Sequence, residues 1–118
     1  MKDAALVSII KCAELEEPNE QDVTLLVGGF LVSGKVISFE KYSQHHPITE
    51  SIAAAFDEAD KALTEEQIAE LGRPNFIHLS GAKYFIPGQQ PIPNGDGVFA
   101  RISLSAVHGF HLGSLQVA

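Results

Sequence analysis

Residues 22–44 constrain the fold of this chain more than any other stretch. They open with a run of β-branched and apolar residues at 23–27, which predicts a strand. Two glycines at 28–29 follow, and such a pair closes tight hairpins because glycine accepts a positive φ at little steric cost. The return strand is expected at residues 30–42, where Gly34 indicates a sharp bend. A long, bent strand after a tight hairpin favours a small closed barrel over a flat sheet.

Bulk properties indicate a single domain spanning residues 1–118, with enough hydrophobic residues (45%) for a true core. No apolar run approaches the ~20 residues of a membrane span, and no signal-peptide pattern is present, so we expect a cytoplasmic protein without a membrane partner. The one cysteine, Cys12, cannot form an internal disulfide. The net charge of −7 opposes nucleic-acid binding, which usually requires a basic face.

Helices are predicted at the N-terminus and in the middle of the chain. Residues 3–16 carry apolar side chains at helical spacing, and Asp3 suits the N-cap position. A helical insert is expected at about residues 45–73, where Pro47 can start a helix. Residues 64–67 have the spacing of a capping box, which predicts a second, short helix.

The C-terminal part of the chain predicts three strands and a loop. Residues 87–97 hold three prolines and three glycines, which is typical of a turn region. Alternating apolar residues follow, and Arg101 falls on the opposite face of their strand. The three strands are expected at residues 76–86, 98–107 and 110–117, with a very short turn at 108–109.

No residue pattern predicts catalysis, a cofactor or a metal. His45 and His46 are adjacent, so their side chains diverge on an extended chain. His108 and His111 are three apart on a predicted turn and strand, which sends them to opposite faces. The chain has no nucleophile elbow, phosphate loop or dinucleotide fingerprint. We therefore expect a protein that is not an enzyme.

Two short motifs resemble those of the Sm and Sm-like protein family. The first runs Gly34, four residues, Phe39-Glu40, Lys41, Tyr42, Ser43-Gln44, and the second is Val107-His108-Gly109. This resemblance implies a mainly β fold with helices: an Sm-like, SH3-type, five-stranded bent barrel. The N-terminal helix and a helical insert between strands two and three complete this expected architecture.

The Sm resemblance also implies a site for single-stranded RNA at the pore of a ring. Tyr42 would stack on a base, Gln44 would hydrogen-bond its edge, and Glu40 would orient the pocket. His108 and Gly109 stand where the family has Arg-Gly, and a neutral histidine weakens the site relative to a permanent cation. We therefore expect at most weak RNA contact.

A homo-oligomeric ring is expected on physical grounds as well. An open five-stranded sheet leaves unpaired edges, and pairing of strand four with a neighbour's strand five can close a ring of unspecified size. Residues 98–117 alternate and contain no proline. The expected interface residues are Ile102, Leu104, Phe110 and Leu112.

A second resemblance covers more of the chain and points to the gas vesicle accessory protein GvpU family. It rests on Ser33-Gly34, the acidic insert at 45–73, Phe76-Ile77-His78-Leu79, and Gly109-Phe110-His111-Leu112-Gly113. This resemblance implies a structural or scaffold accessory protein that does not bind RNA. Two functions therefore stay open from the sequence, namely an RNA-contacting ring and a gas vesicle accessory protein.

Overall fold

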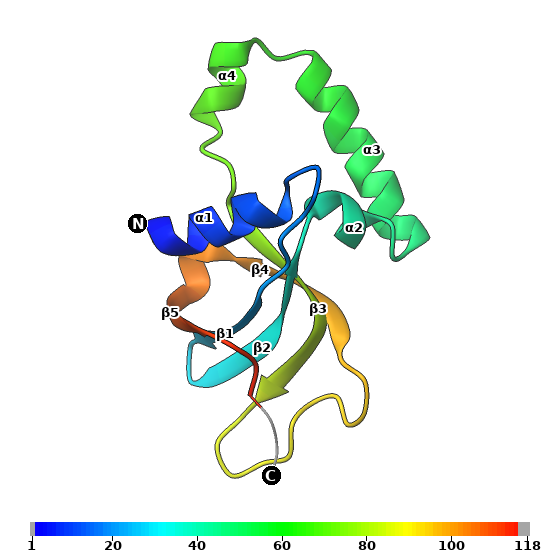
Figure 1. Ribbon diagram of the computed structural model, residues 1–118. Coiled ribbons are helices and arrows are strands. Elements are labelled where there is room, and N and C mark those ends of the chain that lie inside the picture. The colour runs from blue at the N-terminus through cyan, green and yellow to red at the C-terminus, as the bar shows by residue number, and fades with distance from the viewer. Residues whose placement is uncertain (1, 116–118) are drawn as a thin grey trace.

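Five antiparallel strands form one sheet in the computed structural model, which describes residues 2–115 (Figure 1). The sheet order is β4-β3-β2-β1-β5, and no pairing joins β4 to β5 in the described residues. The sheet is therefore open, and the predicted closed barrel is wrong. A five-stranded sheet with an N-terminal helix and a helical insert is confirmed. The strands are β1 (Asp22–Val27), β2 (Phe30–Ile37), β3 (Phe76–Phe85), β4 (Val98–Ser103) and β5 (Val107–Leu112).

The hairpin between β1 and β2 forms as the sequence predicts, but β2 is shorter than expected. Gly28 has a φ of 59°, and Val27 pairs with Phe30 across the two-residue turn. The predicted strand to residue 42 is wrong, because β2 ends at Ile37 and the helix α2 (Phe39–Ser43) follows. The local cause is Ser38, whose side chain accepts a hydrogen bond from the Lys41 amide and caps the helix.

The helix α1 (Ala4–Ala13) lies against the sheet and contributes to its core (Figure 1). The Asp3 carboxylate caps it by accepting hydrogen bonds from the Ala5 and Leu6 amides, as its position in the sequence predicts. Its apolar stripe faces the buried side of the sheet. The core comprises Leu6, Ile10, Ala13, Val23, Leu25, Val32, Val36, Ile77, Leu79, Ala82, Ala100 and Leu104.

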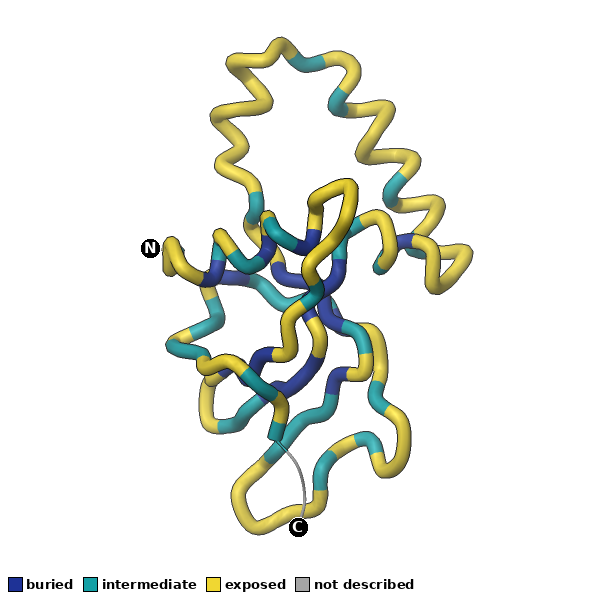
Figure 2. The backbone as a smooth tube through the Cα atoms, in the orientation of Figure 1, coloured by how far each residue is buried: buried dark blue, intermediate teal, exposed yellow. Residues whose placement is uncertain are grey.

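Residues 47–70 form a helical arm, made of α3 (Pro47–Lys61) and α4 (Glu65–Glu70). The predicted capping box is present, with reciprocal hydrogen bonds between Thr64 and Gln67. The arm rises away from the sheet (Figure 1), and neither of its helices contains a buried residue (Figure 2). The predicted insert is confirmed, although it contributes little to the core.

The boundaries of the last two strands differ from the prediction. A single 3₁₀ turn (Leu104–Ala106) separates β4 from β5, so His108 and Gly109 lie inside β5 rather than in a turn. The Leu104 side chain is buried, and its amide donates to the Asn75 carbonyl at 2.9 Å, which turns the chain at this point. The predicted fifth strand at 110–117 is therefore shifted, and its last two residues lie outside the described part of the chain.

Candidate functional site

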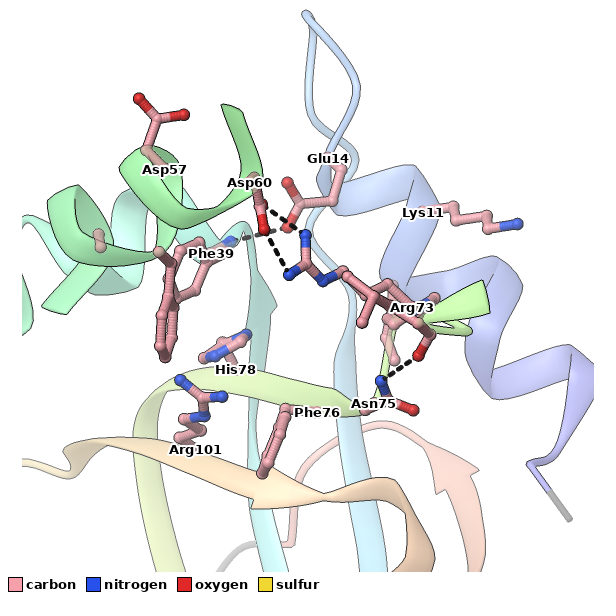
Figure 3. Close-up of a pocket in the computed structure, with 15 residues that line it drawn as sticks. Lys11, Glu14, Phe39, Asp57, Asp60, Arg73, Asn75, Phe76, His78 and Arg101 are labelled. Carbon is pink, nitrogen blue, oxygen red and sulfur yellow. Dashed lines mark hydrogen bonds and ion pairs between the residues drawn. The ribbon is translucent and has the colours of Figure 1, made fainter. Parts of the chain in front are cut away.

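A groove lies between the helical arm, α1 and the start of β3 (Figure 3). Its volume is about 670 Å³. Apolar side chains dominate its walls, with a few charged groups among them. The lining residues are Ile10, Lys11, Glu14, Phe39, Ala53, Phe56, Asp57, Asp60, Leu71, Arg73, Pro74, Asn75, Phe76, His78 and Arg101.

Arg101 is the cation at the floor of this groove (Figure 3). Its guanidinium carbon lies 3.9 Å from the centre of the Phe76 ring, with Phe39 and Phe56 at about 6 Å. Such contacts hold the planar cation through the ring quadrupole. The Arg101 side chain forms no hydrogen bond or ion pair with any residue from 2 to 115. Its N–H donors are therefore open to an external acceptor.

His78 stands beside Arg101 as its direct cross-strand neighbour on β3. Its ring lies between those of Phe39 and Tyr42, with centroid distances of 5.2 and 4.7 Å. The side chain is 7% exposed, and its Nε2 atom has no hydrogen-bond partner in the described structure. Burial and the adjacent Arg101 charge lower the pKa of His78 to about 4, so the ring is neutral at pH 7.

An ion pair joins the helical arm to the segment that leads into β3. Arg73 donates two hydrogen bonds to the Asp60 carboxylate, at 2.7 and 3.0 Å. The Arg73 hydrogen bonds keep the pKa of Asp60 below its ordinary value. Glu14 accepts a hydrogen bond from the Phe39 amide at 2.7 Å, which links α1 to α2. These contacts hold the rim of the groove in place. Two acids of the groove, Glu14 and Asp60, therefore already have hydrogen-bond partners within the chain.

The residues predicted for RNA lie on two separate elements. Glu40 and Tyr42 are on α2 and Gln44 is its C-cap, with the Gln44 amide 3.5 Å from the Glu40 carboxylate. α2 contacts α3 and β3, whereas His108 and Gly109 lie on β5, which pairs with β1 at an edge of the sheet. Tyr42 lies beside His45 and His78, whereas α2 and β5 lie in different parts of the molecule (Figure 1).

The residues predicted for the oligomer interface differ in how far they are buried. Leu104 is a buried core residue, and Ile102 and Phe110 pack partly against the core. Leu112 is exposed on the edge strand β5. Both edge strands of the sheet, β4 and β5, lack a partner strand on their outer side in the described structure. Formation of a ring stays a prediction.

A comparison with protein-family models decides between the two resemblances. A model described as gas vesicle protein GvpU-like matches residues 3–115. The chain belongs to this family. The GvpU-like match spans all five strands and the arm, so it confirms the second resemblance, while the Sm resemblance gains no support beyond its two motifs. No curated protein and no solved structure matches the chain.

Two further observations concern the part of this GvpU-like chain that the structure describes. Within residues 2–115, no three His, Cys, Asp or Glu side chains gather closely enough to hold a metal ion. None of the helices there combines the length and the apolarity that crossing a membrane requires.

Sequence reasoning missed the groove, although one observation pointed to it. Arg101 falls on the opposite face of its strand from the core residues. Its partner across the sheet, His78, becomes evident only once the register of β3 and β4 is known. Two of the aromatic neighbours, Phe39 and Phe56, come from α2 and α3, whose approach to this face depends on tertiary structure.

Proposed function

We propose that this chain is a non-enzymatic accessory protein of gas vesicles that works by contacting other proteins. The observation that carries the proposal is the match of the GvpU-like gas vesicle protein family to residues 3–115. The helical arm adds a physical reason. Ile48, Ile52 and Phe56 recur four apart on α3, and all three are exposed.

An exposed apolar stripe on a helix is costly in water unless a partner covers it. α3 contributes no buried residue, so its stripe adds little to the stability of the subunit. The arm nevertheless has well-formed caps at both of its helices. This combination supports a preformed helical surface for a protein partner, and we assign that role to the arm.

The first test follows a tagged chain in cells that make gas vesicles. After gentle lysis, vesicles float on centrifugation, and the tagged chain should be enriched in the floating layer. Ile48→Gln should reduce this enrichment, because it replaces a side chain that is 64% exposed at the start of the stripe. Leu15→Gln is the matched control, since Leu15 is 58% exposed outside the arm.

The outcomes separate the two parts of the proposal. A wild-type chain that stays out of the floating layer would contradict an accessory role by direct vesicle contact. Enrichment that Ile48→Gln and Leu15→Gln leave equally unchanged would keep the accessory role and remove the arm from it.

A further inference from the structure

The groove below the helical arm has the size of a small-molecule site. Its volume of about 670 Å³ lies within the roughly 300–1,000 Å³ typical of ligand pockets. Phe39, Phe56 and Phe76 supply aromatic walls, and Ile10 and Leu71 supply aliphatic ones. A mostly apolar hollow with a few convergent polar groups is the usual form of a ligand site.

Two polar groups at the floor of this groove lack partners within the described structure. The Arg101 guanidinium is held by its face against Phe76, which leaves its N–H edge without an acceptor from residues 2–115. His78 is more than nine-tenths buried, and its Nε2 atom is also without a partner there. The Nε2 atom is covered by protein atoms, so the polar group that a ligand in the groove can reach is the partly exposed Arg101 guanidinium.

The charges around the groove narrow the class of ligand. The planar fork of an arginine matches a carboxylate, which accepts two parallel hydrogen bonds. Asp60 is occupied by Arg73, and Asp57 points away from Arg101 (Figure 3). Even so, these acids and the net charge of −7 disfavour polyanions such as RNA or an acidic peptide. A single negative charge on an apolar body fits best.

We propose that the groove binds a small apolar monocarboxylate, such as an arylalkanoic acid. Its carboxylate accepts hydrogen bonds from Arg101 at the floor, next to His78. Its apolar body lies along Phe39 and Phe56, which stack at a centroid distance of 6.4 Å. This site does not depend on the gas vesicle role, although Phe56 belongs both to the apolar stripe of α3 and to the wall of the groove.

The test is a titration followed by nuclear magnetic resonance, with hydrocinnamate as the probe. Its neutral amide, hydrocinnamamide, is the matched comparison, and inorganic phosphate tests the charge without the apolar body. Hydrocinnamate should shift the resonances of His78 and Phe39 and should bind about tenfold or more tightly than the amide, because hydrogen bonds to charged groups are the stronger ones. Phosphate should bind more weakly than hydrocinnamate.

Arg101→Met keeps an unbranched side chain over Phe76 and removes the charge. It should abolish the preference for the acid over the amide. Lys83→Met removes a cation on the neighbouring strand β3, outside this groove, and should retain the preference. If Arg101→Met fails to fold, Phe56→Ala on the exposed arm should weaken the binding of acid and amide alike.

Equal affinity for the acid and the amide would overturn the proposal. So would an acid preference that survives in Arg101→Met, or resonance shifts confined to residues outside the groove. No saturable binding of hydrocinnamate at millimolar concentration would overturn it as well. None of these results bears on vesicle flotation, so the two proposals fail separately.

Discussion

Gly34 sits at a close approach of β2 and β3, which makes it a sensitive test of the sheet geometry. β3 carries a bulge opposite it, since the register shifts between Ser33 and Lys35. A Cβ atom added at Gly34 would lie 3.1 Å from the Ser80 carbonyl oxygen and 3.2 Å from the Ala82 Cα. Both are backbone atoms of the neighbouring strand, so neither can move aside as a flexible side chain would.

The cost of Gly34→Ala follows from these contacts. Overpacking of a well-packed interior costs about 1–3 kcal/mol. The loss of glycine's freedom in the unfolded chain offsets about 0.4–1 kcal/mol of this. We therefore expect a net loss of up to about 2.6 kcal/mol for Gly34→Ala. Gly34→Val adds two more methyl groups at the same place and should cost more.

Gly109→Ala is the matched control, because Gly109 also lies in a strand. An added Cβ there meets nothing within 4 Å. The same unfolded-state effect should make this variant equal to or slightly more stable than the wild type. Urea unfolding followed by circular dichroism measures all three variants. For a chain of 118 residues, about 1 kcal/mol corresponds to about 4 °C in Tm.

The two alanine variants should therefore shift stability in opposite directions. A Gly34→Ala protein as stable as Gly109→Ala would refute the close approach of β2 and β3 at this point.

Three further predictions concern acid stability, the assembly and the arm. The unfolded His78 titrates near its ordinary pKa of 6.5 and the folded one near 4, so the unfolded state binds more protons between these values. The contribution of neutral His78 to the free energy of unfolding should be fully present above pH 6.5 and should fall by at most about 3 kcal/mol on acidification to pH 4. The variant His78→Phe should lack this loss of stability in acid. Light scattering at tens of micromolar should give a mass several times that of one chain if the edges β4 and β5 pair between subunits, and a single-chain mass would exclude the ring. Thr64→Ala should lower the helix content of the arm, because it removes a capping box worth about 0.5–2 kcal/mol; unchanged circular dichroism would contradict this role.

Local patterns predicted much of this fold, because their causes are local. The Asp3 cap, the tight turn at Gly28 and the capping box at Thr64 each depend on neighbours within a few residues. The helix α2 was missed for a related reason. Ser38 can continue a strand or cap a helix, and the apolar run before it favoured the strand.

The end of β4 and the groove could not be predicted, because both depend on contacts between distant segments. The bond from the Leu104 amide to the Asn75 carbonyl joins two loops far apart in the sequence. The groove needs the register that sets His78 beside Arg101, and the arm that carries Phe56 over them. Family membership, in turn, came from a match across residues 3–115 rather than from any one motif.

Direct binding to isolated vesicles tests the central claim, that this GvpU-like chain is an accessory protein of gas vesicles. Purified protein is mixed at increasing concentration with purified vesicles, and the floating layer is collected and quantified. We expect saturable recovery of the chain in that layer, and its loss from the layer when the vesicles are first collapsed by pressure. A chain that stays in the liquid below intact vesicles at every concentration would contradict the claim.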